Sequence, residues 1–258
     1  MKRELPPEIL DWLEPRSKPI ALALDYDGTL VPICQTPEQA HPDSELLNLL
    51  RDLAQQVVVV ILTGRDRSVM AQWIPDRSIT IVTSHGAEWR RDGRWRPLFI
   101  SPKDQRPMRV LTERLEKAFG KTPGVIIEDK KATVAFHYRL VDPHNQNDLL
   151  NRFTDLVRPW LGENQEFEVL EGKCVREVRP EGLNKGRALR HVLDEIGIGD
   201  LPVLAMGDDR TDEDMFQGLK NGDLSVFVGP TRTSAAVQLR DVWEARKLLK
   251  AVLRLEWM

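Results

Sequence analysis

The chain alternates short, wholly apolar runs with longer segments in which apolar residues recur at helical spacing. A run that is apolar at every position is typical of a strand covered on both faces, as in a parallel sheet. The intervening segments have the three- and four-residue spacing of helices with one buried face. Five strands are predicted at residues 20–24, 57–62, 79–82, 202–206 and 224–228.

Helix signals lie between and after these runs. Asp43 or Ser44 can cap a helix that carries Leu46 and the leucines after it, and Asn184 can start another that Gly197 and Gly199 stop. A last helix is predicted over residues 242–255. Alternating strands and helices indicate βαβ units, hence a Rossmann-like α/β fold with a parallel sheet and helices on both faces.

Residues 102–180 interrupt this alternation. Helices are predicted at 109–119 and 147–160, and strands at 125–128, 132–138, 167–170 and 175–179. Two helices with several consecutive strands are typical of an α+β unit. The predicted organisation is therefore a catalytic core of residues 1–101 and 181–258, with a smaller α+β cap of residues 102–180 inserted into it.

Composition limits the partners and the location. The 258 residues include 37 basic and 40 acidic side chains, a net charge of −3, which gives no electrostatic footprint for nucleic acid or an anionic membrane. The apolar runs are too short to span a bilayer. Cys34 and Cys174 are expected to be reduced thiols, and a single disulfide between them is the alternative. We expect a cytoplasmic protein that binds a small molecule, with a monomer favoured.

Polar clusters follow the apolar runs, at the sheet edge where open α/β proteins bind ligands. Asp25 and Asp27 leave the first run, followed by Gly28. Two carboxylates so close to a buried strand favour a divalent cation as their partner. The alternative is a turn in which both carboxylates cap backbone amides. Residues 207–214 contain five acidic residues; Asp208 suits a metal ligand, and the later ones also suit a helix start.

Two further clusters suit an anion. Thr63, Gly64 and Arg65 follow the second run, where a hydroxyl and backbone amides at a helix start can bind phosphate. A plain helix cap is the alternative. Lys185 is predicted in the first helical turn, which disfavours a cation unless its ammonium reaches a phosphate or carboxylate. A solvated surface lysine is the alternative there.

The order Asp25-x-Asp27-Gly-Thr, Thr63-Gly64, Lys185 and Gly-Asp208-Asp209 resembles the haloacid dehalogenase superfamily of phosphohydrolases. The resemblance implies that Asp25 is the nucleophile and forms an aspartyl-phosphate, and that Asp27 is the general acid and base. It implies a Mg²⁺ ion held by the side chains of Asp25 and Asp208 and by the Asp27 carbonyl, with Asp209 and Asp212 supporting that shell. Phosphate would bind at Thr63, Gly64 and Lys185.

Further motifs resemble the trehalose-6-phosphate phosphatase family. They include residues 84–88, the Glu128-x-Lys130 pair, residues 172–180 around Glu177, and residues 207–216. This resemblance implies hydrolysis of trehalose 6-phosphate to trehalose and phosphate. It assigns substrate binding to Glu128, Lys130, Glu177, Arg65 and His85, with the cap closing over the core. Surface ion pairs are the alternative for the cap residues, and His85 and His137 lack metal-ligand spacing.

Three other functions stay open at this point. The chain could be a phosphatase of another sugar or polyol phosphate in the same superfamily. It could be a phosphomutase, which shares the aspartyl nucleophile but returns the phosphoryl group to a second hydroxyl. In a different class, it could be a catalytically inactive ligand-sensing module, although the joint presence of Asp25, Asp27, Thr63, Lys185 and Asp208 disfavours that.

Overall fold

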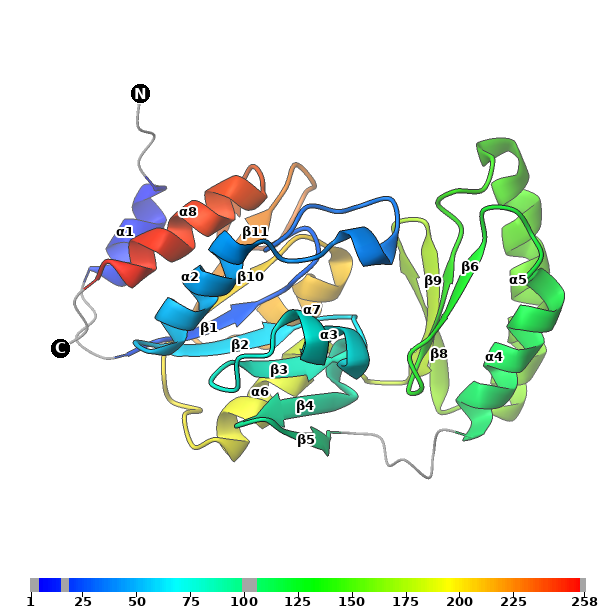
Figure 1. Ribbon diagram of the computed structural model, residues 1–258, viewed down its shortest axis with the longest axis horizontal. Helices are drawn as coiled ribbons and strands as arrows, with labels where there is room; N and C mark the ends of the chain where they lie inside the picture. Colours follow the sequence, from blue (N-terminus) through cyan, green and yellow to red (C-terminus); the bar gives the residue numbers. More distant parts are fainter. Residues whose placement is uncertain (1–4, 15–18, 99–105, 256–258) are drawn as a thin grey trace. The chain divides into compact units, whose positions relative to one another are not determined.

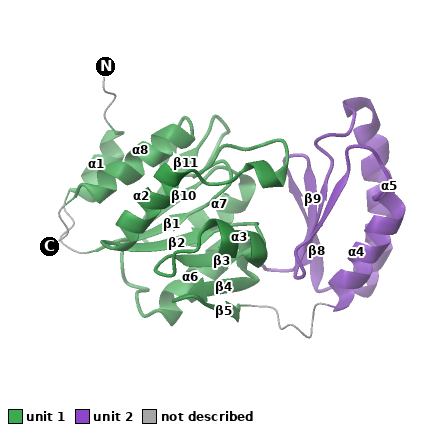
Figure 2. Cartoon of the chain, viewed as in Figure 1, with its two compact units in different colours: residues 1–98, 184–258 green, residues 99–183 purple. Residues whose placement is uncertain are grey.

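The computed structural model describes residues 5–14, 19–98 and 106–255. The chain forms two compact units (Figure 2). The first unit, here called the core, comprises residues 1–98 and 184–258, and the second, here called the cap, comprises residues 99–183. The cap is one continuous segment, so the core is assembled from two parts of the chain that flank it.

The core is built on a mixed eight-stranded sheet. Its strands are β1 (Ala21–Leu24), β2 (Val58–Leu62), β3 (Thr80–Thr83), β4 (Glu88–Arg91), β5 (Arg94–Pro97), β10 (Val203–Gly207), β11 (Leu224–Val228) and β12 (Val237–Leu239). They lie in the order β12-β11-β10-β1-β2-β3-β4-β5 (Figure 1). The predicted α/β fold is confirmed, but the sheet is not parallel throughout, because β4 runs antiparallel to β3 and β5 antiparallel to β4.

Helices cover both faces of this sheet. They are α1 (Pro7–Leu13), α2 (Ser44–Ala54), α3 (Arg67–Trp73), α6 (Lys185–Glu195), α7 (Arg210–Gln217) and α8 (Val242–Leu253), with short 3₁₀ turns η1 (Pro37–Gln39) and η2 (Ser84–Gly86). Alternate residues of β1 divide between the faces: Leu22 and Leu24 pack in the cluster that contains α2 and α8, and Ala21 and Ala23 in the cluster that contains α6 and α7. This division explains why the strand is apolar at every position. None of the described helices is long and apolar enough to cross a membrane.

The β4–β5 hairpin was not predicted. Its sequence alternates arginine with tryptophan, which carries no continuous apolar run. Trp89 is buried in the core, and the guanidinium of Arg96 lies 5.6 Å from the centre of its ring. Cation–π contacts therefore let a strongly charged segment extend the sheet.

The cap has its own sheet and its own apolar core. Its strands β6 (Ile126–Asp129), β7 (Val134–His137), β8 (Phe167–Gly172) and β9 (Val175–Pro180) form an antiparallel sheet in the order β6-β7-β9-β8. Helices α4 (Arg106–Phe119) and α5 (Pro143–Glu163) cover one face, where Val134, Phe136 and Val178 are buried. Alternation along β7 and β9 then places Ala135 and Glu177 on the opposite face. Among the described residues Cys34 and Cys174 are both free thiols.

Candidate active site

The topology of the core sheet brings the first and last acidic motifs together. Strands β1 and β10 are parallel neighbours, with Leu24 opposite Met206. Strand β2, the next strand in the sequence, lies beside β1 on one side, and β10 lies beside β1 on the other side. The direction in which strands are added to the sheet therefore reverses between β1 and β10. Ligands of open α/β sheets bind at such a reversal, beyond the carboxyl ends of the strands. Asp25 directly follows β1, and Asp208 directly follows β10.

A glycine allows the two acidic loops to approach each other. Gly28 has φ +89°, a left-handed conformation that favours glycine, and its N–H donates to the Val31 carbonyl at 2.7 Å. A Cβ atom at this position would lie 2.0 Å from Asp208 Oδ2. The Asp-Gly sequence is therefore required both for the turn after Asp27 and for the place that Asp208 occupies.

Lys185 is the centre of a buried charge cluster. Its Nζ donates to Asp25 Oδ1 at 2.5 Å and to Asp212 Oδ1 at 2.7 Å. The side chains of Lys185, Asp25 and Asp212 are 2%, 7% and 0% exposed. The surface-lysine interpretation is therefore wrong. Lys185 does not follow a core strand, however, because it begins α6 directly after the cap.

Asp212 and Asp209 have different local roles. Asp212 Oδ2 accepts the backbone N–H groups of Asp208 and Asp209, both at 3.0 Å, so both of its oxygens already accept hydrogen bonds. Asp209 is the N-cap of α7 and shares a capping box with Asp212. These contacts suit residues that hold the loop of Asp208, the supporting role expected from the sequence.

The carboxylates crowd one another, and this changes their proton affinity. Burial raises the pKa of Asp25 to about 7, although Lys185 opposes the shift. Burial, together with the charges of Asp25 and Asp212, raises the pKa of Asp208 to about 9. The same two neighbours raise the pKa of Lys185 despite its burial, which keeps its ammonium charged. Carboxylates in such a site require a proton or a cation for neutralisation.

The donor set fits a divalent metal ion. Asp25, Asp208 and Asp212 each have a carboxylate oxygen within 4.8 Å of the other two. Because both oxygens of Asp212 already accept hydrogen bonds, Asp25 and Asp208 are the better metal ligands of the three. Asp25 Oδ2 is buried and accepts no hydrogen bond from the residues that the structure describes. Hard divalent cations bind carboxylate oxygens of this kind. The core therefore has a place for the positive charge that its carboxylates require.

Thr63, Gly64 and Arg65 form a loop between β2 and α3. Thr63 is buried, and its Oγ1 accepts the N–H of Arg65 at 3.1 Å. The alternative of a plain helix cap is wrong for Thr63, because α3 begins at Arg67 with Asp66 as its N-cap. His85 lies against this loop: its N–H donates to the Thr63 carbonyl at 3.0 Å, and a Cβ at Gly64 would lie 2.5 Å from its Nε2.

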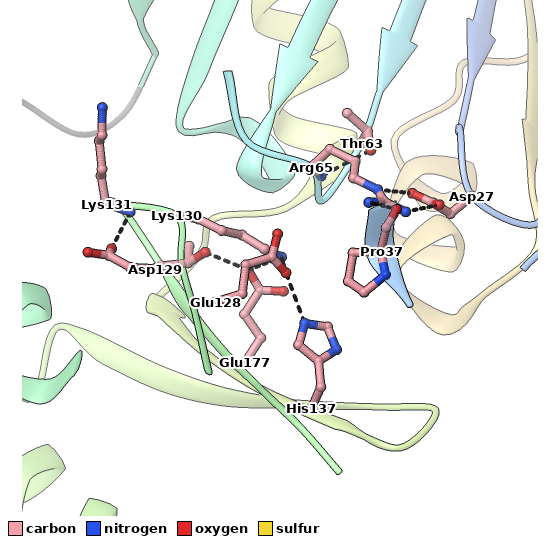
Figure 3. Close-up of polar contacts among 11 residues, drawn as sticks. Asp27, Pro37, Thr63, Arg65, Glu128, Asp129, Lys130, Lys131, His137 and Glu177 are labelled. Carbon is pink, nitrogen blue, oxygen red and sulfur yellow. Dashed lines mark hydrogen bonds and ion pairs between the residues drawn. The ribbon is translucent and has the colours of Figure 1, made fainter. Parts of the chain in front are cut away.

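Arg65 binds Asp27 through a two-pronged ion pair that the sequence did not indicate. Its Nε donates to Asp27 Oδ2 at 2.8 Å and its Nη2 to Asp27 Oδ1 at 2.5 Å (Figure 3). Its Nη1 donates to the Pro37 carbonyl at 2.6 Å, and the guanidinium lies 5.0 Å from the ring centre of Trp73. This bidentate geometry fixes the position of the Asp27 carboxylate.

Arg246 is a second positioning group that sequence reasoning missed. It lies on α8, it is buried, and its Nε donates to the Leu30 carbonyl at 2.8 Å. Its Nη1 donates to Asp43 Oδ2 at 2.5 Å, while Asp43 also caps α2. The arginine thus ties the end of the Asp25 loop to two helices. No motif marks it, since it belongs to an ordinary amphipathic helix.

The cap carries a second polar cluster on the sheet face opposite its helices. Glu128 and Glu177 flank Ala135 in register across β6, β7 and β9. Lys130 Nζ lies 3.4 Å from Glu177 Oε1 and 3.9 Å from Glu128 Oε2, and His137 Nε2 lies 2.9 Å from Glu128 Oε2 (Figure 3). The structure therefore brings the three predicted cap residues, Glu128, Lys130 and Glu177, close together. His137 is an additional hydrogen-bond partner of Glu128.

Comparison with known proteins agrees with this geometry. The family model described as "Trehalose-phosphatase" matches residues 23–242. A trehalose-6-phosphate phosphatase-related protein of Thermoplasma acidophilum is 32% identical over 89% of this chain and 95% of its own length. A bifunctional trehalose-6-phosphate synthase/phosphatase of Thermoproteus tenax is 34% identical over 91% of this chain but only 32% of its own length. This chain thus spans about a third of that longer relative.

A solved structure supports the same family. The C-terminal domain of the trehalose-6-phosphate phosphatase of C. albicans superposes with a TM-score of 0.84 at 27% identity, covering 97% of each chain. The resemblance predicted from the motifs is confirmed by these matches. With the match extending from within β1 to the start of α8, the chain belongs to the trehalose-phosphatase family.

Proposed function

We propose that this protein hydrolyses trehalose 6-phosphate to trehalose and inorganic phosphate, with Mg²⁺ as its metal ion. The observation that carries the proposal is the cluster of buried Asp25, Lys185 and Asp212 with half-buried Asp208, at the strand-order reversal of the core. Such a cluster has an excess of negative charge, whereas its expected substrate is an anion. Asp25 and Asp208 would hold a divalent cation there, which would supply the positive charge that an anionic substrate requires beside these carboxylates.

Asp25 is the proposed nucleophile. One of its carboxylate oxygens attacks phosphorus and forms a P–O bond, and the bond from phosphorus to the sugar oxygen breaks. Lys185 holds Asp25 Oδ1 at 2.5 Å, which orients the carboxylate and leaves Oδ2 for other partners. The product of this step is an aspartyl-phosphate on Asp25 and a free sugar hydroxyl.

Asp27 supplies and removes the protons. In the first step it gives a proton to the departing sugar oxygen, and in the second it takes one from the water that hydrolyses the aspartyl-phosphate. In this structure the ion pair with Arg65 occupies both oxygens of the Asp27 carboxylate. Arg65 therefore holds Asp27 in its resting position, and Asp27 has to leave this pair to carry the proton. The contact of Arg65 with substrate that the motifs implied stays a prediction.

The remaining core residues bind phosphate and metal. Thr63, the amide of Gly64 and Lys185 are assigned to the phosphoryl oxygens. Asp25, Asp208 and the carbonyl of Asp27 are assigned to Mg²⁺, supported by Asp209 and Asp212. When bound, the ion would neutralise phosphoryl charge and fix the in-line geometry of attack. His85, adjacent to Gly64, is assigned to substrate contact.

The cap is assigned to recognition of the sugar. Glu128, Lys130 and Glu177 offer charged hydrogen-bonding groups, which bind neutral hydroxyls more strongly than neutral groups do. The cluster has two carboxylates, and both have nitrogen partners: Lys130 lies against Glu128 and Glu177, and His137 lies against Glu128. The monomeric state and cytoplasmic location expected from the sequence stay predictions.

The test is phosphate release from a panel of sugar phosphates, with and without Mg²⁺, by the wild type and by Asp25→Asn. The matched control is Asp52→Asn, an exposed aspartate on α2. We expect metal-dependent release from trehalose 6-phosphate, loss of at least about 10³-fold in Asp25→Asn, and no change in the control. Better hydrolysis of another sugar phosphate would overturn the substrate assignment. Isomerisation without phosphate release would indicate a mutase.

A further inference from the structure

Thr133 connects two of the polar groups on the face of the cap sheet opposite its helices. It lies just before β7 and is wholly buried. Its hydroxyl lies 2.6 Å from Glu177 Oε1, a short bond to a carboxylate in which the hydroxyl donates. Its carbonyl accepts the backbone N–H of Lys130 at 3.0 Å. One residue thus holds Glu177 by its side chain and Lys130 by its backbone.

The turn between β6 and β7 makes this double contact possible. Lys131 has φ +66°, and its N–H donates to Asp129 Oδ1 at 2.7 Å. The Ala132 N–H donates to the Lys130 carbonyl at 2.8 Å. These bonds fix the path of the chain from Lys130 to Thr133, so the spacing between the Lys130 backbone and the Thr133 hydroxyl is set locally.

Glu177 depends on such a partner because it is buried. The residue is 5% exposed, and Lys130 Nζ lies 3.4 Å from the same oxygen that the hydroxyl contacts. A buried carboxylate without hydrogen bonds is strongly disfavoured. A donor that locks one oxygen also fixes the rotamer, so the carboxylate is already ordered before a ligand arrives.

We propose that Thr133 is a positioning residue for sugar recognition: its hydroxyl holds Glu177, and its backbone holds Lys130, in the arrangement that binds substrate hydroxyls. The inference rests on the proposed function, in which Glu177 and Lys130 contact the sugar. Thr133 itself touches neither sugar nor phosphate. Its loss therefore affects binding of the sugar and leaves the phosphoryl chemistry of the core intact.

The experiment compares Thr133→Val, which removes the hydroxyl and keeps the shape, with Thr133→Ser, which keeps the hydroxyl. The matched control is Thr112→Val, because Thr112 is also buried in the cap but donates to the Met108 carbonyl at 3.0 Å within α4. For each variant, kcat and KM are measured with trehalose 6-phosphate and with p-nitrophenyl phosphate, together with the thermal midpoint of unfolding.

For Thr133→Val we expect KM for trehalose 6-phosphate to rise about 10-fold, as for loss of one hydrogen bond to a charged group. Activity on the aryl phosphate should stay within about twofold, since that ester has no sugar to bind. Thr133→Ser should restore KM, and Thr112→Val should leave it unchanged. In a Glu177→Gln background, Thr133→Val should add little, because both changes act on the same contact.

An unchanged KM in Thr133→Val, an equal loss on both substrates, or full additivity with Glu177→Gln would overturn the inference. If Thr133→Val does not fold, Thr133→Ala carries the same expectation and the same contradiction. Failure of the wild type to hydrolyse trehalose 6-phosphate would be a different result, because it would refute the proposed function and not the link between Thr133 and Glu177.

Discussion

The core and the cap each hold a cluster of charged side chains, but the two clusters differ in balance. In the core, Asp25, Asp208 and Asp212 gather around Lys185, so negative charge exceeds positive. In the cap, Glu128 and Glu177 lie against the ammonium of Lys130, and Glu128 also contacts the imidazole of His137, so each carboxylate has a nitrogen partner on the cap itself. The core carboxylates outnumber their one ammonium and require a proton or a cation for neutralisation, whereas the cap cluster has fewer carboxylates and suits hydrogen bonding to a neutral ligand.

This difference separates two tasks that a phosphatase of a sugar phosphate must perform. The phosphoryl group carries the negative charge of the substrate, whereas the sugar distinguishes this substrate from other phosphate esters. Under the proposed function, the excess carboxylate of the core lies where the metal ion would bind, so the core would do the chemistry and the cap would select the substrate. Four experiments test this difference between the two clusters.

The largest effect is expected from metal removal. Chelation followed by gel filtration should lower phosphate release by about 10³-fold or more on every substrate, because the core cluster loses its neutralising charge. Added Mg²⁺ should restore activity and raise the thermal midpoint of unfolding, since a ligand of the folded state stabilises it. Asp208→Asn should abolish that rise. A midpoint insensitive to Mg²⁺ in the wild type would contradict the metal assignment.

The next effect concerns Lys185. Lys185→Met removes the cation from a fully buried cluster, and we expect the free energy of unfolding without metal to fall by about 3 kcal/mol, with activity lost as well. The control is Lys250→Met, whose lysine is partly exposed and pairs with Glu45; it should change stability by less than about 0.5 kcal/mol. Denaturant titration measures both. An equal loss of unfolding free energy in Lys185→Met and Lys250→Met would contradict the inference that the core carboxylates depend on a buried cation.

A smaller and selective effect is expected in the cap. Glu128→Gln removes one charged acceptor, so kcat/KM for trehalose 6-phosphate should fall about 10-fold, as expected for one charged hydrogen bond. Activity on p-nitrophenyl phosphate should be preserved. Glu113→Gln, an exposed site on α4, serves as the control. A parallel loss on both substrates would show that the cap acts on the chemistry and not on selection.

The smallest effect tests a carboxylate at the edge of the core cluster. Glu213 follows Asp212 on α7 but meets the hydroxyls of Thr233 and Ser234. Partial burial works to raise the pKa of Glu213, but these hydrogen bonds prevail and hold it below its ordinary 4.5. The ionised form is therefore the one that the folded state favours.

The sign of the pH dependence follows from that lowered pKa. The stability that ionised Glu213 contributes is present above pH 4.5 and is lost as pH falls through the lower folded value. We expect the wild type to exceed Glu213→Gln by less than about 1 kcal/mol at pH 7, since the group is partly exposed. The difference should shrink below pH 4.5 in denaturant titrations. A difference in stability between the wild type and Glu213→Gln that grows as the pH falls would contradict the lowered pKa of Glu213.

Much of the fold could be read from the sequence because its signals are local. The continuous apolar runs predicted β1, β2 and β10, and Asp43 and Asn184 cap their helices as expected. The β4–β5 hairpin was missed, because buried Trp89 and half-buried Trp95 lie among arginines, which break up the apolar pattern. Sheet direction at that edge was missed for the same reason.

The candidate site, like the fold, was only partly predictable from the sequence. Sequence alone determined which residues follow which strand, so it brought Asp25 and Asp208 to one sheet edge. Tertiary structure decided their partners: Lys185 reaches Asp25 across 160 residues, Arg65 reaches Asp27 across 38, and Thr133 reaches Glu177 across 44. Residue spacing encodes periodicity within one element, whereas contacts between elements depend on strand order and register, which only the packed chain defines.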